Sequence, residues 1–198
     1  MGMTMSAAER LTSTAARLFE EKGLTRVGIN EITREADVAR MSLYNNFRSK
    51  EDLALAAYAD MSRSRHDAIA EAAAGACSPA DAVLTIFDLA EHLAEAPGFR
   101  GCIFINLAAH LDEADDRLVD LVRKHKRDLR ERFEDLMRHH GASDPETLGR
   151  QLLALWDGAL VDTFIEGSTA PIKAARAAAT KLIGAYKPSR DRILHGGS

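Results

Sequence analysis

A short run of polar side chains has the chemistry needed to read the edges of DNA bases. Arginine and asparagine can each form two parallel hydrogen bonds with one base, and serine and tyrosine add single hydrogen bonds. On one face of a helix, such side chains fit the major groove of B-form DNA. We therefore expect a recognition helix here. For Tyr44, the alternative is that its ring packs in the core. The run comprises Arg40, Met41, Ser42, Tyr44, Asn45 and Asn46.

The surrounding stretch, residues 29–47, supplies the elements that would position this face. Its apolar spacing predicts two short helices, 29–35 and 40–46, joined by a tight turn. Asp37 lies in that turn, where a left-handed backbone is often needed and Asp is among the tolerated residues. The apolar positions that would close one small core are Ile29, Ile32, Ala36, Val38, Leu43 and Phe47.

Helix pairs this short need neighbours, and the sequence predicts one on each side. Ser6 and Glu9 form a capping box that opens a helix over 7–22, which a glycine then ends. Ser49 and Asp52 cap a longer helix that runs to about residue 73. The first 50 residues therefore predict a compact helical head.

Helical spacing continues through the rest of the chain, and we find no convincing strand. Caps, prolines and glycines divide it into helices over 79–96, 100–111, 115–140, 145–166 and 171–187. The last two combine broad apolar faces with many alanines, which let helices approach closely, so we expect them to form a subunit interface. The alternative is that they complete the core of the monomer. The fold class expected is all-α.

Composition indicates a folded protein without a membrane span. Residues 1–50 carry 8 Lys+Arg and 6 Asp+Glu, a charge of +2, and residues 51–198 carry 18 and 24, a charge of −6. A basic head on an acidic body suits a DNA-binding protein. Cys77 and Cys102 are too few for a disulfide framework, which favours the cytoplasm. We expect no metal site and no cofactor.

Residues 11–53 resemble the DNA-binding domain of the tetracycline-repressor-like (TetR) family of transcription regulators. The resemblance implies a helix-turn-helix domain over 1–50, a helical ligand-binding and dimerisation domain over 51–187 and a tail over 188–198. It also implies a homodimer on a pseudo-palindromic operator, released by a small-molecule effector. The motifs that carry it are Leu18-Phe19, Lys22-Gly23, Ile29 with Ile32, Ala36, Val38, Leu43-Tyr44, Phe47 and Ser49-Lys50-Glu51.

The resemblance also implies roles for single residues. Arg40, Ser42 and Asn45 would face base edges. Tyr44, Asn46 and Lys50 would lie near phosphates, beside the free amides at the start of the helix that follows. Asn30 would lie close to the groove. Where relatives often have other residues, this chain has Val27, Gly28, Asp37, Ala39, Met41, Asn45 and Asn46, and these departures bear on the operator sequence.

An effector pocket among the middle helices is a further implication of the resemblance. The run Gly101-Cys102 with Asn106 resembles a segment of some family members. For each apolar candidate the alternative is an ordinary place in the core. The candidates for the lining are Phe87, Phe99, Cys102, Phe104, Asn106, His110, Trp156 and Phe164.

Two other classes of function stay open at this point. A helical enzyme would use Cys102 and His110, although no nucleophile elbow or glycine-rich phosphate loop accompanies them. A helix-turn-helix head can also serve as a protein-interaction module without DNA. We expect a regulator rather than an enzyme.

Overall fold

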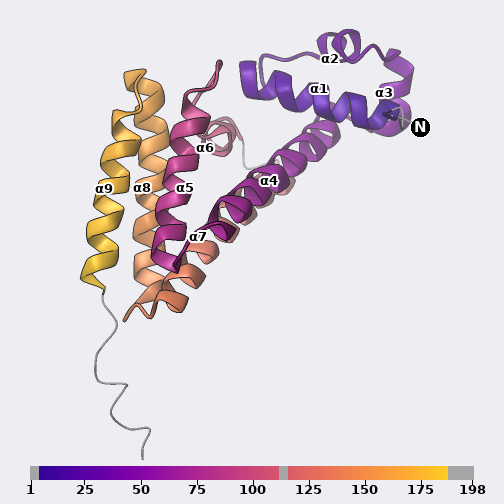
Figure 1. The fold of residues 1–198 in the computed structure, drawn as a ribbon. Coiled ribbons are helices and arrows are strands. Elements are labelled where there is room, and N and C mark those ends of the chain that lie inside the picture. Colours follow the sequence, from indigo (N-terminus) through magenta and orange to yellow (C-terminus); the bar gives the residue numbers. More distant parts are fainter. Residues whose placement is uncertain (1–4, 112–115, 187–198) are drawn as a thin grey trace, which may run out of the picture. The chain divides into compact units, whose positions relative to one another are not determined.

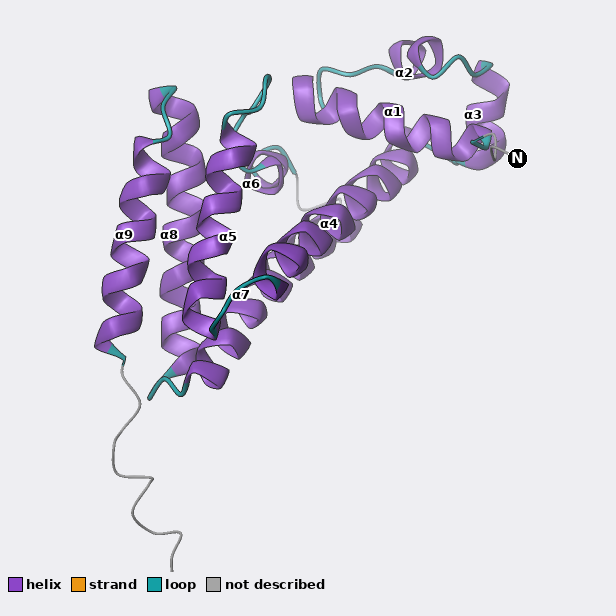
Figure 2. Cartoon of the chain, viewed as in Figure 1, coloured by secondary structure: helices purple, strands orange, loops and turns teal. Residues whose placement is uncertain are grey.

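The computed structural model describes residues 5–111 and 116–186, which fold into nine helices without a strand (Figures 1 and 2). The all-α class expected from the sequence is confirmed. The tail expected at 188–198 lies outside the described residues. The helices are α1 Ala7–Lys22, α2 Ile29–Glu35, α3 Arg40–Asn46, α4 Lys50–Ala74, α5 Pro79–Ala94, α6 Ile103–Ala108, α7 Asp116–His140, α8 Pro145–Glu166 and α9 Ala170–Ala185.

The chain separates into two compact units. The first comprises residues 1–66 and 102–125, and the second comprises residues 67–101 and 126–198. Helices α4 and α7 each begin in the first unit and end in the second. The boundary expected near residue 50 concerns function rather than compactness, and it stays a prediction.

Side-chain caps set several helix ends. Ser6 Oγ accepts a hydrogen bond from the Glu9 amide at 3.2 Å, and Glu9 Oε2 accepts one from the Ser6 amide at 2.7 Å. Ser78 and Asp144 accept from amides three residues later, at the starts of α5 and α8. Since these caps satisfy amides that a helix leaves without partners, α1, α5 and α8 begin where the sequence predicts.

Helix α6 is shorter than the helix predicted over 100–111. Gly101 has φ +74, a left-handed conformation that cannot continue into a right-handed helix. Cys102 follows as an extended N-cap, so the helix begins only at Ile103. At the other end Ala109 is the C-cap. Six residues remain helical.

The core of the first unit joins α1 to α4, α6 and α7. Leu11, Leu18 and Leu43 are fully buried where α1 packs against α2 and α3. The Phe19 ring lies 5.8 Å from the Tyr58 ring of α4, between centroids, and Tyr58 lies 6.2 Å from the ring of Phe104. Burial raises the pKa of Tyr58 to about 12, so this phenol stays neutral.

The second unit contains a bundle in which α5, α8 and α9 lie side by side (Figure 1). The Phe87 ring lies at its centre, 6.4 Å from Phe133 and 5.8 Å from Trp156 between ring centroids. At Gly149 a Cβ atom would come within 3.0 Å of the Glu134 backbone nitrogen of α7. Only glycine permits the α7 and α8 backbones to approach so closely.

Candidate DNA-binding face

The turn between α2 and α3 sets the direction in which α3 begins. The Asp37 amide donates to the Arg34 carbonyl at 3.2 Å, and the Val38 amide donates to the Thr33 carbonyl at 3.0 Å. This pair of hydrogen bonds is a Schellman motif, which requires a left-handed residue after the helix. Asp37 has φ +50, as the sequence predicts.

Arg10 of α1 forms a hydrogen bond with the same turn. Its Nη2 atom donates to the backbone carbonyl oxygen of Asp37 at 2.7 Å. The Asp37 carboxylate lies 3.9 Å from Arg10 Nη1 but is fully exposed, so the backbone contact is the stronger constraint. The sequence gives no signal for this contact because the two residues are 27 positions apart.

Ion pairs tie α1 to α2 at the surface. Lys22 Nζ lies 2.6 Å from Glu31 Oε1, and Arg17 pairs with Glu35. The hydrogen bond from the Lys22 ammonium is the main cause that lowers the pKa of Glu31. These contacts are exposed and screened by salt, so they orient α2 more than they stabilise it.

Helix α3 turns one side into the core and the other to solvent. Leu43 is fully buried, whereas Arg40 and Asn45 are exposed. Met41 is 71% exposed and Tyr44 is 42% exposed. The exposed fraction of Tyr44 argues against its alternative role as a packed core aromatic. The polar run therefore faces outward as the helical spacing predicts.

Two contacts within α3 restrict its exposed side chains. The guanidinium carbon of Arg40 lies 5.8 Å from the centroid of the Tyr44 ring, at cation–π distance. Asn46 Nδ2 donates to the Ser42 carbonyl at 2.7 Å. Since one amide hydrogen of Asn46 is used within its own helix, one remains for a phosphate.

Lys50 is less available than its sequence position indicates. Its Nζ atom donates to the Leu24 carbonyl at 2.7 Å, which ties the loop after α1 to the start of α4. Burial lowers the pKa of the Lys50 ammonium. An ammonium group has three donors, so two remain for a phosphate.

The start of α4 is partly occupied by the chain's own groups. Ser49 Oγ accepts from the Asp52 amide at 3.2 Å. Asp52 also pairs with Arg48 at 2.8 Å and with Arg117 of α7. The phosphate site expected beside Lys50 therefore has fewer free amides and lies close to carboxylates, which disfavour an anion.

Further cations of the head were not singled out from the sequence. Arg26 and Arg34 are exposed and have no ion-pair partner among the described residues. They are candidates for phosphate contacts, as is Asn30, which is exposed in the first turn of α2.

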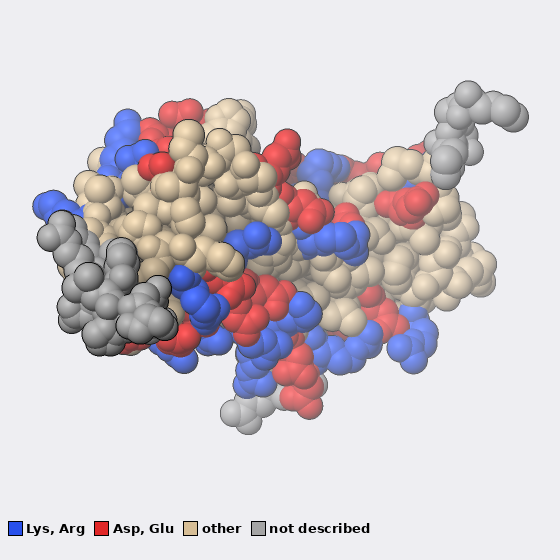
Figure 3. All heavy atoms as spheres, turned by 60° about the horizontal axis from the view of Figure 1, so that its bottom comes forward, with Lys and Arg blue, Asp and Glu red and all other residues tan. Residues whose placement is uncertain are grey.

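Lysine and arginine do not gather into one patch on the face drawn in Figure 3. Basic and acidic side chains are interspersed there. Helix α3 contributes one formal charge, that of Arg40. The assignment therefore depends on the hydrogen-bonding groups of α3 rather than on a basic patch.

The structure places the candidate effector residues in different surroundings. Phe87, Phe104, Trp156 and Cys102 are each at most 8% exposed and belong to the packed core. Asn106 and His110 are exposed. Phe99 and Phe164 line a pocket in the second unit. Four of the eight residues belong to each compact unit.

Grouped metal ligands and long apolar helices are both lacking in the described part of the chain. Within residues 5–111 and 116–186, no three His, Cys, Asp or Glu side chains are grouped to hold a metal ion. In the same stretches, no helix combines the length and the apolarity needed to cross a bilayer.

Two family models match this chain. Residues 11–57 match bacterial regulatory proteins of the tetR family, and residues 79–179 match the tetracyclin repressor-like C-terminal domain. The first match covers α2, α3 and the turn between them. The second covers most of the bundle formed by α5, α8 and α9.

Relatives and solved structures agree with these matches. The HTH-type transcriptional repressor NemR of Escherichia coli is 24% identical over 184 residues, which cover 88% of this chain and 92% of NemR. A TetR-family transcriptional regulator from Streptomyces coelicolor is 28% identical with a TM-score of 0.86, over 92% of this chain and 91% of that one. A TetR transcriptional regulator from Chloroflexus aurantiacus is 26% identical with a TM-score of 0.80, over 90% and 94%.

Proposed function

Because the chain belongs to the tetR family of bacterial regulatory proteins, we propose that it is a transcriptional repressor that binds operator DNA and leaves it when a small effector binds. One observation carries the proposal. The Schellman turn at Asp37 and the contact from Arg10 fix a helix whose exposed residues are mostly hydrogen-bonding groups. A helix held in this way can enter the major groove without reorganising.

Direct reading of bases is assigned to three side chains of α3. Arg40 would pair with guanine and Asn45 with adenine, each contributing about 1–3 kcal/mol of discrimination. Ser42, which is half-buried, would contact either base. Met41 is available for apolar contact with a thymine methyl group. The stacking of Arg40 near Tyr44 supports this role because it limits the directions of the guanidinium.

Contacts with the DNA backbone are assigned to residues around α3. Tyr44, Asn46 and Lys50 would donate to phosphates, and Asn30 would lie close to the groove. Such contacts position the head on the duplex but do not identify a sequence. The remaining donors of Lys50 and Asn46 support this assignment, although each side chain already makes one contact within the chain.

Two copies of the chain are needed to read a pseudo-palindromic operator. We assign the contact between them to α8 and α9, which expose small and apolar residues next to charged ones such as Arg150, Asp162 and Lys181. A Cβ atom at Gly158 or Gly184 would meet no atom within 4 Å, so a partner helix has room to approach. Two heads about 34 Å apart, or a multiple of that, would then read an inverted repeat. The small and apolar residues of this surface are Ala154, Gly158, Val161 and Ile165 on α8, and Ala174, Ala177 and Gly184 on α9.

An effector would release the operator by binding one state of the dimer more tightly than the other. Tight binding to both states would not change the equilibrium. A homodimer that binds chromosomal operators and senses small molecules would act in the cytoplasm.

The other classes of function are not favoured. The relatives named above are transcription regulators, which disfavours an enzyme that uses Cys102 and His110. Cys102 is buried as the N-cap of α6, and His110 follows that helix in an exposed turn. A head that binds only proteins is disfavoured for the same reason.

The proposal is tested by selecting binding sites from random duplexes with the full-length protein. We expect an inverted repeat, whose half-sites lie one or more helical turns apart, and protection of both half-sites in a footprint. Arg63→Ala, which removes an exposed cation from α4 outside the head, is the control and should select the same sequence. Recovery of no enriched duplex at low salt would contradict the proposal.

A further inference from the structure

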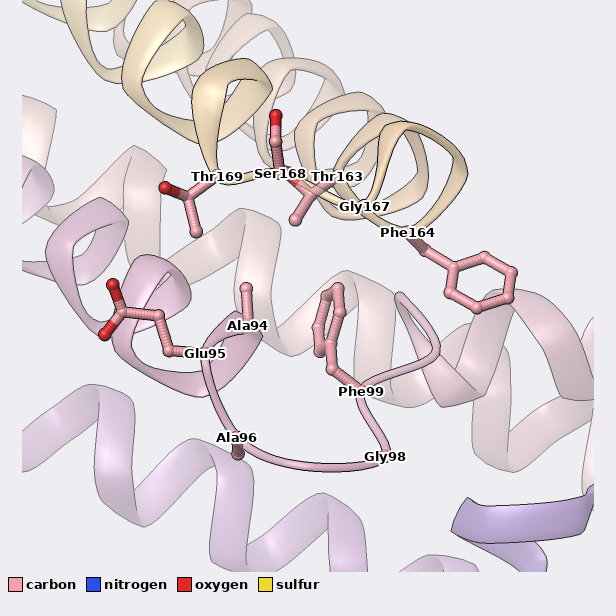
Figure 4. Close-up of a pocket in the computed structure, with 10 residues that line it drawn as sticks. All are labelled: Ala94, Glu95, Ala96, Gly98, Phe99, Thr163, Phe164, Gly167, Ser168 and Thr169. Atoms are coloured by element: carbon pink, nitrogen blue, oxygen red, sulfur yellow. The ribbon is translucent and has the colours of Figure 1, made fainter.

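A pocket of about 410 Å³ opens where α5 and α8 end (Figure 4). Its walls are the end of α5 with the loop that follows, and the end of α8 with the turn to α9. The volume lies in the range of sites that hold small molecules. All its lining residues belong to the second compact unit. They are Ala94, Glu95, Ala96, Gly98, Phe99, Thr163, Phe164, Gly167, Ser168 and Thr169.

Thr163 gives this pocket an unsatisfied polar group. Its side chain is 4% exposed, and its Oγ1 atom has no hydrogen-bond partner among the described residues. A buried hydroxyl without a partner destabilises the fold, so proteins usually satisfy it. The Oγ1 atom is itself covered by protein, so it would bond to a bound molecule only after the Thr163 side chain rotates toward the pocket.

Other helical threonines of this chain show what Thr163 forgoes. Thr33, Thr85 and Thr180 each donate to the carbonyl oxygen four residues earlier, at 3.1, 2.9 and 3.0 Å. Thr163 could make the same contact with its own helix but does not. Its carbonyl oxygen instead accepts the Gly167 amide at 3.0 Å, which ends α8. Thr163 therefore differs from these three threonines, whose hydroxyls are satisfied within their own helices.

The formal charge of the lining comes from Glu95 alone. This carboxylate is exposed and has no ion-pair partner among the described residues. Glu91, one turn earlier, is instead neutralised by Lys173 at 3.0 Å. Because the lining contains no lysine, arginine or histidine, its potential favours a cation over an anion.

Apolar groups make up the remaining surface. Figure 4 shows the Phe99 ring and the Ala94 side chain on the side of the pocket that faces Thr163, while the Phe164 ring points outward. An aromatic face attracts both flat apolar molecules and cations. A ligand with an apolar body and one positive group would match both parts of the lining.

We propose that this pocket binds an amphipathic cation, a small molecule with an aromatic or aliphatic body and a protonated amine. The amine would pair with Glu95, the body would pack on Phe99, and a polar atom would bond to the Thr163 hydroxyl. The proposal deepens the repressor function above and rests on it only for the claim that such a ligand is the effector.

The loop that forms one wall of the pocket is followed directly in the chain by α6. Gly98 and Gly101 of that loop have φ values of +84 and +74, which other residues rarely adopt. A Cβ atom at Gly101 would lie 3.2 Å from the Leu160 carbonyl of α8. Because the loop is closely fitted, a ligand against Phe99 would displace the segment that leads directly into α6.

The test uses three probes with one indole body and different charges: tryptamine, tryptophol and indole-3-propionate. Binding to the full-length protein is measured by ligand-observed NMR and calorimetry. We expect tryptamine to bind at least about tenfold more tightly than tryptophol, and the carboxylate to bind least. Tryptamine binding no better than the other two, or not at all up to about 10 mM, would overturn the proposal.

Variants locate the binding within the molecule. Glu95→Gln should abolish the preference for tryptamine over tryptophol, whereas Glu71→Gln, the same change outside the lining, should keep it. Thr163→Val should weaken tryptamine binding about fivefold or more. Thr180→Val, on α9, should not. If Thr163→Val only changes the melting temperature and leaves binding intact, the assignment of its hydroxyl is wrong.

A separate titration on operator DNA distinguishes this proposal from the function it builds on. If the protein binds its operator but no probe binds at Glu95, the pocket proposal fails and the repressor proposal stands. If tryptamine binds in a Glu95-dependent way while no operator is found, the repressor proposal fails and the pocket proposal stands.

Discussion

The head formed by α1 to α3 and the pair formed by α8 and α9 expose opposite kinds of surface. Helix α3 buries Leu43 and exposes Arg40, Tyr44 and Asn45. Helix α8 buries Leu152 and Trp156, yet it also exposes Ala154, Gly158 and Ile165, the last of them 71% exposed.

The chemistry of each face indicates a different partner. A polar face loses little in water and gains specificity when its donors meet fixed acceptors, as they do in a DNA groove. An apolar face of small residues gains free energy only when another apolar surface covers it. The contrast therefore supports the proposal that α3 contacts DNA and that α8 and α9 contact a second copy of the chain.

Placing a charged side chain on the apolar face of α8 should have the largest effect on operator affinity. Gly158→Arg places a long charged side chain where a partner helix would approach, and we expect a monomer. One head then binds without its twin, so operator affinity should fall by at least about a thousandfold. Sedimentation measures the state of association, and a gel shift measures the affinity.

A matched change at the same position separates folding from association. Gly158→Ala should stabilise α8 by up to about 1 kcal/mol through its helix propensity and should leave the dimer intact. A Gly158→Arg protein that remains dimeric would refute the interface assigned to α8.

A substitution at Arg40 tests the proposed role of the polar face of α3. Arg40→Ala should cost about 1–3 kcal/mol on the selected operator and should relax the preference at one base pair in each half-site. Competition among operators that differ at single positions provides the measurement. Uniform weakening on every sequence would instead place Arg40 at a phosphate.

A smaller effect is expected at Lys50, and it should be of a different kind. Lys50→Ala should weaken all DNA sequences similarly and lower the slope of log affinity against log salt by about one. Because the Leu24 carbonyl loses its donor, the head should also lose about 1 kcal/mol of stability. Arg63→Ala removes an equal charge elsewhere, and its salt slope should match the wild type.

The smallest effects concern the turn that precedes α3. Asp37→Ala keeps a Cβ atom at φ +50 and removes the polar group that tolerates it, so it should cost about 1 kcal/mol of unfolding free energy. Asp37→Gly should cost nothing or stabilise slightly. Urea denaturation compares the two proteins. Equal stability for both would contradict a strained turn, and Arg10 should hold the backbone carbonyl in each.

Local chemistry explains why the sequence predicts the helices of the head so closely. The capping box at Ser6 and Glu9 and the left-handed Asp37 act within a few residues, so their consequences are readable without a structure. Helix α6 was predicted too long because the left-handed backbone of Gly101 depends on its close fit against α8. That fit joins residues distant in sequence.

The candidate sites show the same limit. Periodicity cannot separate an aromatic residue of the core from one that lines a pocket, and Phe87 and Phe104 proved to be core whereas Phe99 borders open space. The missing partner of Thr163 has no trace in the sequence, because it depends on one rotamer. The bond from Lys50 to Leu24 spans 26 positions and was equally invisible.

The single tryptophan of this chain makes the contrast between the two regions measurable without a label. Trp156 is 6% exposed and packs against Phe87 in the second unit. Its fluorescence emission therefore reports the unfolding of the second unit, whereas circular dichroism reports the loss of helix in both units. If the two optical signals show the same unfolding transition, the two units unfold cooperatively. If they show different transitions, each signal gives the unfolding midpoint of a separate part.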